Sequence, residues 1–178
     1  MQLLFSLLVF VAFGIVVLYW TVALLARRGK CLQLSDDLGR VGLAIAFLVS
    51  TTSMLGSLYF SEIANYEPCR LCWYQRIFMY PISIVLLVAL IRRRRDVVPY
   101  VLTLALLGSV ISVYHYLVEW YPTLESNVCS LDVPCTTVWF REFGFISLPQ
   151  MALTGFVTVF TVLVAPQITR VKNQAVSE

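Results

Sequence analysis

The sequence contains little charge: only 13% of its 178 residues are charged, 60% are hydrophobic, and the mean hydropathy is +0.83. A soluble domain of this size needs far more polar surface, so the scarcity of charge excludes that class and indicates a protein whose solvent is the bilayer. Linkers, internal repeats and low-complexity tracts are also missing. These absences favour one membrane domain over the whole of residues 1–178.

Five runs of the sequence lack any formal charge, and these runs predict the membrane helices. A helix needs about 20 apolar residues to cross about 30 Å of hydrocarbon, and four of the runs are long enough. The third run would cover only ~22 Å at about 1.5 Å per residue, so its helix must begin near Leu71, which draws Arg76 below the outer headgroups. The runs are Met1–Ala26, Val41–Ser61, Ile77–Ile91, Val97–Val118 and Phe143–Thr169.

The first run has no basic residue before it, whereas Arg27, Arg28 and Lys30 follow it. A secretory signal peptide has the opposite order of charge and a shorter apolar core. We therefore expect residues 1–26 to remain as an N-terminal transmembrane helix, the first of five. The predicted fold is all-α, a multi-pass membrane helical bundle.

Basic residues are scarce in every second connection between the runs. With the amino terminus outside, the inner connections hold ten of the thirteen Lys and Arg residues, in groups of four, four and two. Lys and Arg accumulate in cytoplasmic connections, so we predict an outer N-terminus and a cytoplasmic C-terminus. The outer connections are then residues 62–70 and 119–148.

The five cysteines divide between the two sides of this topology. Cys69, Cys72, Cys129 and Cys135 fall on the outer side, where disulfides persist, and Cys31 alone falls inside. The outer four can form a four-thiolate zinc site, two structural disulfides, or a thiol–disulfide exchange system. An oxidising compartment disfavours standing thiolates, and a Cys-x-x-Cys ring is too small to stabilise much through chain entropy. The pattern therefore favours exchange without a metal, and Cys31 is expected to be a free thiol without a role.

The residues around Cys72 favour a reactive thiolate. Pro68 stands where a helix can begin, so Cys72 falls in the first turn, where exposed N–H groups and the helix dipole favour negative charge. Arg76 follows four residues later on the same face, and a guanidinium there stabilises the thiolate, which is the reactive form. An arginine at membrane depth usually marks a functional site, although it can also snorkel to the headgroups.

The sequence has one histidine, His115, near the outer end of the fourth run and at a depth similar to that of Arg76. A lone membrane histidine is often a packing residue. Together with Cys72 and Arg76, however, His115 outlines a polar site at the outer edge of the bundle, open to a lipid-soluble molecule.

The second cysteine pair closes a seven-residue ring, "CSLDVPC", and "TTVWFREFGFISLP" follows it. Trp139, Phe140 and Phe143 can share one face of a short helix while the two charged residues between them point to water, as in a segment that lies in the membrane interface. Such a helix would hold the Cys129–Cys135 loop within reach of Cys69. An aromatic belt with no further role is the alternative.

Four stretches of the sequence carry a family resemblance: "CRLCWYQR", "HYLVEWYP", the second cysteine pair, and "FGFISLPQMAL". With them, the chain from Arg40 to Pro166 resembles the DsbB/BdbC family of disulfide bond formation proteins, and "CSLDVPC" and "FGFISLP" are most similar to its BdbC-type branch. These are bacterial cytoplasmic (inner) membrane oxidases that pass electrons from a soluble thioredoxin-fold disulfide oxidase (DsbA/BdbD-like) to a quinone. The first helix departs from the family's usual four-helix pattern, so the resemblance implies a four-helix core at residues 40–166 and an additional N-terminal transmembrane helix at residues 1–26.

The resemblance implies a role for each candidate residue. Cys69 and Cys72 match the quinone-proximal pair, with Cys72 meeting the quinone, and Cys129 and Cys135 match the pair that exchanges with the soluble partner. The resemblance also places two residues beside the quinone ring, Arg76 and His115.

The implied activity is that of a protein-dithiol:quinone oxidoreductase using ubiquinone or menaquinone, in contact with membrane lipid and without nucleic acid. Two other classes stay open on the residues alone. A thiol reductase of similar build would run electrons in the opposite direction, and a scaffold would use both cysteine pairs as structural disulfides.

Overall fold

The computed structural model describes residues 2–28, 32–125, 129 and 133–175, so Cys31 lies outside the described residues. The described residues form five long helices and one short 3₁₀ turn, and they contain no β-strand. All five helices are long and apolar enough to cross a membrane. The prediction of an all-α, multi-pass membrane bundle is therefore confirmed. The elements are α1 (Gln2–Arg28), α2 (Leu32–Glu62), α3 (Arg70–Arg92), α4 (Val98–Trp120), η1 (Pro122–Leu124) and α5 (Leu148–Ala175).

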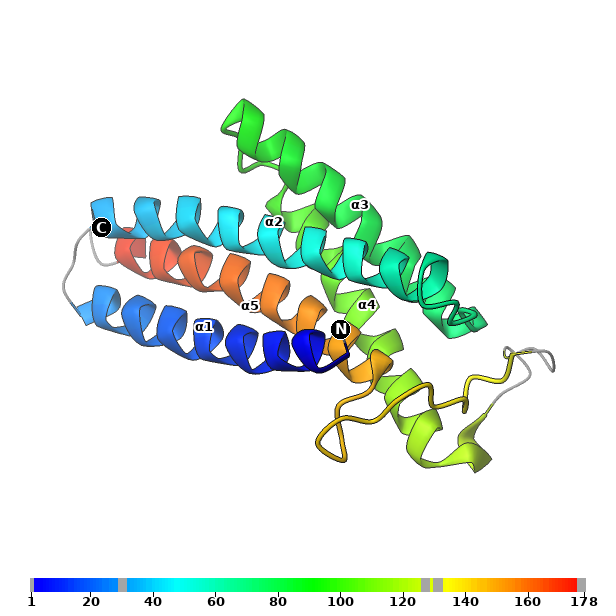
Figure 1. The fold of residues 1–178 in the computed structure, drawn as a ribbon. Helices are drawn as coiled ribbons and strands as arrows, with labels where there is room; N and C mark the ends of the chain where they lie inside the picture. The colour runs from blue at the N-terminus through cyan, green and yellow to red at the C-terminus, as the bar shows by residue number, and fades with distance from the viewer. Residues whose placement is uncertain (1, 29–31, 126–128, 130–132, 176–178) are drawn as a thin grey trace.

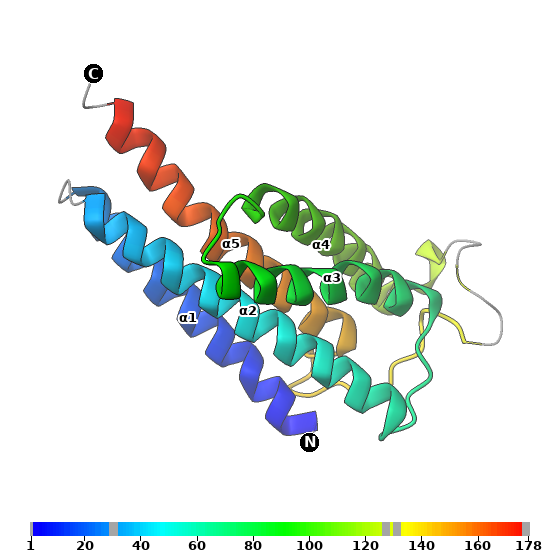
Figure 2. The ribbon, with the colours of Figure 1, turned by 90° about the horizontal axis from the view of Figure 1, so that it is seen from above.

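The helices pack in two groups around α5. Helices α1, α2 and α5 run side by side, and α3 and α4 form a second pair inclined to them (Figures 1 and 2). Helix α5 contacts α1, α2 and α4, so it lies at the centre of the bundle. Its side chains accordingly form much of the core, with Phe156, Val159 and Val162 fully buried.

Helix α3 spans the short third run because it begins inside the cysteine motif. Its first residue is Arg70, one position before the predicted start, and it continues for 23 residues to Arg92. Cys69 is the N-cap, and its extended backbone follows Pro68, which disfavours a helical start any earlier. The span therefore includes Arg76, as the helix-length argument predicted.

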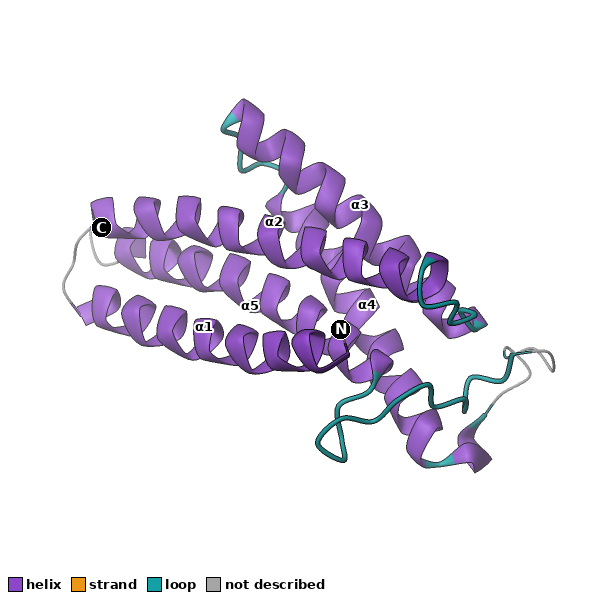
Figure 3. Cartoon of the chain, in the orientation of Figure 1, coloured by secondary structure: helices purple, strands orange, loops and turns teal. Residues whose placement is uncertain are grey.

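The described segment from Val133 to Ser147, between η1 and α5, is a loop (Figure 3), and the short helix predicted over Trp139–Phe143 is wrong. Phe143 and Gly144 both have positive φ, 51° and 81°, and two successive residues of that kind reverse the chain instead of continuing a helix. Glu142 and Ile146 pair across the reversal, each N–H donating to the other residue's carbonyl at 2.9 Å.

The aromatic residues of this loop consequently point in different directions. The ring of Trp139 stacks on that of Tyr66 at 4.8 Å, and the ring of Phe140 lies 5.6 Å from that of Phe60 at the end of α2. Phe143 instead meets Phe10 of α1 edge-on at 5.6 Å. Contacts between aromatic rings, and not the face of a helix, therefore hold the loop against the bundle.

Candidate redox site

The first cysteine pair lies at the N-terminus of α3. Cys69 and Cys72 are both free thiols, and their sulfurs are 3.0 Å apart. The Sγ atom of Cys69 also accepts the backbone N–H of Cys72 at 3.4 Å, so the cysteine caps the helix that carries its partner. This arrangement follows from the Cys-x-x-Cys spacing, because an N-cap side chain reaches the N–H group three residues ahead.

Cys69 receives more stabilising contacts than the sequence indicated. Nε2 of His115 lies 3.5 Å from its sulfur, and His115 is only 3% exposed. The hydrogen bond with the Cys72 thiol, opposed by burial and supported by His115, lowers the pKa of Cys69 from 9.0 to about 4. The sequence predicted the activated thiolate at Cys72, beside Arg76. The structure instead places the helix cap and the imidazole at Cys69.

This difference yields a prediction about pH. Because its pKa is low, Cys69 in the reduced protein should be ionised above about pH 5, and its alkylation rate should be nearly flat between about pH 6 and pH 8. Cys72→Ala should restore a steep rise with pH, and His115→Ala a smaller one. Iodoacetamide labelling of the Cys69 peptide, quantified by mass spectrometry, measures the effect. A steep profile in the unmodified protein would contradict the assignment.

Arg76 is fixed between α3 and α2. Its Nε donates to the hydroxyl of Ser57 at 2.9 Å and its NH2 donates to the Ser57 carbonyl at 3.0 Å. The guanidinium carbon also lies 5.2 Å from the centre of the Trp73 ring. These contacts hold the guanidinium of Arg76 against α2 beside Ser57.

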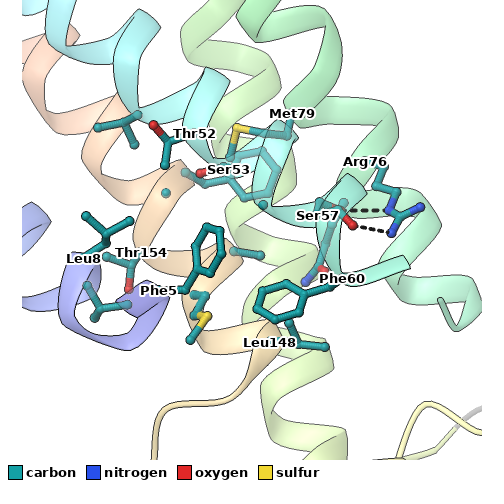
Figure 4. A pocket seen from close by; sticks show the side chains of 18 of the residues that line it. Phe5, Leu8, Thr52, Ser53, Ser57, Phe60, Arg76, Met79, Leu148 and Thr154 are labelled. Atoms are coloured by element: carbon teal, nitrogen blue, oxygen red, sulfur yellow. Dashed lines mark hydrogen bonds between the residues drawn. The ribbon is translucent and has the colours of Figure 1, made fainter. Parts of the chain in front are cut away.

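Arg76 and Cys72 line a cavity of about 270 Å³ enclosed by α1, α2, α3 and α5. Most of its wall is apolar, and its polar groups include Arg76 and Gln75; Gln75 is buried and donates to Ser112 at 3.1 Å. Figure 4 shows Arg76 bonded to Ser57 on one side and residues of α1 across from it. A largely apolar cavity with a few convergent polar groups is typical of a site for a small lipid-soluble molecule.

The second cysteine pair is a disulfide between Cys129 and Cys135. Cys135 is 1% exposed and lies in one buried cluster with Cys69 and Val118, whereas Cys129 is only partly buried. The backbone N–H of Cys135 donates to the Glu125 carboxylate at 2.8 Å. In this joined state neither sulfur is a free thiol.

A smaller hollow lies beside the first cysteine pair. Cys69, Cys72 and His115 form one side of it, and Val133 and Pro134 of the disulfide loop form another. Cys72 lines both this hollow and the large cavity, whereas Cys69 lines only the small one. Among the described residues, the first cysteine pair therefore lies between the loop disulfide and the large cavity.

The family is decided by comparison with known proteins. Residues 39–166 match the family model described as "Disulfide bond formation protein DsbB". The chain is 41% identical over 132 residues to "Probable disulfide formation protein C 2" of Bacillus anthracis, covering 74% of the chain and 94% of that protein. The chain belongs to the DsbB family. As a member of this family, it is a membrane oxidoreductase of disulfide bond formation.

Two further relatives agree with this DsbB assignment. The chain is 42% identical over 120 residues to "Disulfide bond formation protein C" of Bacillus subtilis, covering 67% of the chain and 87% of that protein. It is 45% identical over 116 residues to "Probable disulfide formation protein C" of Halalkalibacterium halodurans, covering 65% and 85%. No solved structure was found to match the chain. Helix α1 lies outside the matched DsbB region.

His115 occupies a different position in this DsbB family member from the one the sequence suggested. Beside Cys69 it borders the small hollow, and it is not among the described residues that line the large cavity. Its Nδ1 is buried and has no hydrogen-bond partner among the described residues. The sequence indicated a position near the outer end of the fourth run, but a histidine there can face either side of α4.

Sequence reasoning missed one residue of the DsbB site, Glu119. Its buried carboxylate accepts hydrogen bonds from Arg141 at 2.9 Å and from the Ser147 hydroxyl at 2.5 Å, and it borders the small hollow. The guanidinium of Arg141 lies 4.2 Å from the centre of the Trp120 ring. The available signal was spacing, since Glu119 follows His115 by four residues and so shares its helical face. This ion pair ties the loop after the disulfide to the end of α4.

Proposed function

We propose that this protein reoxidises a soluble thioredoxin-fold disulfide oxidase (DsbA/BdbD-like) and passes the electrons through its two cysteine pairs to a membrane quinone. The observation that carries the proposal is the position of the first cysteine pair: Cys72 borders the apolar cavity, and Cys69 shares a buried cluster with Cys135 of the loop disulfide. Cys69 and Cys72 therefore have access to a lipid-soluble acceptor on one side and to Cys129 and Cys135 on the other.

The loop disulfide takes electrons from the partner. A partner thiolate attacks Cys129, the more exposed of the two sulfurs, and Cys135 leaves as a thiolate. The partner's second thiolate then attacks the partner sulfur of the mixed disulfide. This step releases the oxidised partner and leaves both loop cysteines reduced.

The same chemistry moves the electrons to the first pair. The Cys135 thiolate attacks Cys69 of an oxidised Cys69–Cys72 pair, and Cys72 leaves as a thiolate. Cys129 then attacks Cys135, which closes the loop disulfide and releases Cys69. The common buried cluster of Cys69 and Cys135 supports this pairing, and the contact of His115 with Cys69 supports its release as a thiolate.

The large cavity has the chemistry to hold a quinone, either ubiquinone or menaquinone. When bound, a quinone accepts two electrons and two protons and becomes a quinol. Apolar walls suit its ring and tail, and Arg76 and Gln75 supply hydrogen-bond donors for its oxygens. Cys72 borders that space, and Cys69 reforms the disulfide with it across an existing sulfur separation of 3.0 Å.

The proposed location is the bacterial cytoplasmic (inner) membrane, with the N-terminus outside and the C-terminus cytoplasmic. Two observations support this orientation. Ten of the thirteen Lys and Arg residues then lie inside, and both cysteine pairs meet at one end of the bundle, on the side where disulfides persist.

Catalytic oxidation of dithiothreitol by the purified protein tests the proposal. In lipid nanodiscs with a soluble quinone analogue, we expect many thiols to be oxidised per protein molecule, and Cys72→Ala to abolish that turnover. A scaffold with two structural disulfides would give no quinone-dependent oxidation. A reductase would instead be driven by quinol and would reduce the partner's disulfide. Either of these outcomes would refute the proposed function.

A further inference from the structure

Helix α1 forms part of the wall of the large cavity, although it lies outside the region that matches the family. We propose that α1 is a quinone-binding element of this protein. It contacts the apolar carbon atoms of a prenylated quinone, and its side chains limit which quinones fit the cavity. This inference rests on the proposed function and extends it to a helix without an assigned role. The α1 residues that line the cavity are Phe5, Leu8, Val9, Val11, Ala12 and Ile15.

The outer end of α1 is held tightly against α2. A β-carbon at Gly56 would lie 2.6 Å from Cε1 of Phe5, so the phenyl ring occupies space that only a glycine leaves open. The same ring lies 5.1 Å from the ring of Phe60. The side-chain amide of Gln2 also donates to the hydroxyl of Tyr66. Phe5 is thereby both an anchor of α1 and a part of the cavity wall.

The inner end of α1 is held in a similar way. The hydroxyl of Tyr19 donates to the carbonyl of Leu38 at 2.7 Å, and Tyr19 is only 5% exposed. A β-carbon at Gly42 would lie 2.6 Å from that hydroxyl oxygen. Because both ends are fixed, the separation of α1 from α2 between them is set by the fold.

Between these two anchors α1 and α2 enclose the cavity. Ala12 lines it from α1, and Val49 and Thr52 line it from α2. Figure 4 shows Phe5 and Leu8 on the α1 side, across from Arg76. Apolar walls favour apolar ligand atoms over water. Helix α1 therefore contacts the carbon atoms of the quinone, while Arg76 donates a hydrogen bond to one of its oxygens.

The opposite face of α1 provides a control surface. Gly14 is exposed, and a β-carbon there would have no atom within 4 Å. Ala12, two residues earlier, is half-buried and lines the cavity. The same large side chain placed at these two positions therefore enters the cavity in one case and the lipid in the other.

We expect Ala12→Trp to raise the quinone concentration for half-maximal dithiothreitol oxidation about tenfold, because a bulky side chain overfills the site. The reduction of the loop disulfide by the partner should keep its rate. Gly14→Trp should match the unmodified protein in both measurements. If Ala12→Trp binds quinone as the unmodified protein does, α1 is not part of the site.

Photolabelling of the unmodified protein tests the same inference without a substitution. A photoreactive azidoquinone should label peptides within residues 5–15 as well as peptides of α2, α3 or α5. Labelling confined to those three helices would overturn the inference even if Ala12→Trp failed to fold. Failure of the proposed function is distinguishable, because the unmodified protein would then show no quinone-dependent oxidation at all.

Discussion

Arg76→Ala is expected to weaken the apparent affinity for quinone by roughly 10–100-fold, since a hydrogen bond to a charged group contributes about 1.5–3 kcal/mol. Ser57 holds the guanidinium on the cavity wall, and the N–H groups that do not bond Ser57 are donors for a quinone oxygen. Arg76→Lys keeps the charge but loses the planar fork that bonds Ser57 twice, so its effect should be smaller than that of alanine. Exchange at Cys129–Cys135 should be nearly untouched in both variants.

The measurement is quinone-dependent oxidation of dithiothreitol over a range of quinone concentrations. Arg70→Ala is the matched control, because Arg70 is exposed at the start of the same helix and does not line the cavity. Gln75→Ala should lose less than Arg76→Ala, since a neutral amide interacts more weakly with a developing oxyanion. Unchanged quinone affinity in Arg76→Ala would mean that the arginine serves only to join α3 to α2.

Cys135→Ala is expected to accumulate a covalent complex between Cys129 and the soluble partner. Cys129 is the partly exposed member of the loop pair and Cys135 is buried, so the Cys129 thiolate can attack the disulfide of the oxidised partner, and the partner's second cysteine leaves as a thiolate. Cys135, which would displace the partner from Cys129, is absent in this variant. The reciprocal variant, Cys129→Ala, should trap roughly tenfold less partner because the remaining sulfur is inaccessible.

The membranes are mixed with an excess of the oxidised partner and quenched with acid, and non-reducing electrophoresis then measures both complexes. The complexes should disappear on reduction, and Cys129→Ala combined with Cys135→Ala is the background control. More complex in Cys129→Ala than in Cys135→Ala would reverse the proposed order of attack. No complex in either variant would make the loop disulfide structural.

The sequence predicted the helices well because the bilayer imposes their length and composition. Uncharged runs located all five, and the shortness of the third run predicted the start of α3 to within one residue. The loop before α5 was predicted wrongly, because its course depends on the positive φ of Phe143 and Gly144. An aromatic residue in that conformation gives no signal in the sequence.

The candidate site was predictable in its residues but not in its geometry. Spacing alone identified the cysteine pairs, and it indicated that Arg76 lies within the third helix and His115 within the fourth. The orientation of each side chain depends on how the helices pack, so His115 turned out to contact Cys69. The contribution of α1 to the cavity wall could not be predicted for the same reason, since the sequence of a helix that is apolar on all sides does not indicate which face lines a cavity. The Glu119–Arg141 ion pair joins positions far apart in the chain.

The proposed path of electrons is tested most directly by counting the electrons that each protein molecule passes to quinone in a single turnover. Fully reduced protein, with both pairs as thiols, is mixed with excess quinone without oxygen, and quinol formation is followed by absorbance. Two cysteine pairs in series predict about two quinols per protein, about one when Cys129 and Cys135 are both replaced by alanine, and none when Cys69 and Cys72 are replaced. Quinol formation by the variant that lacks Cys69 and Cys72 would contradict the proposed path of electrons.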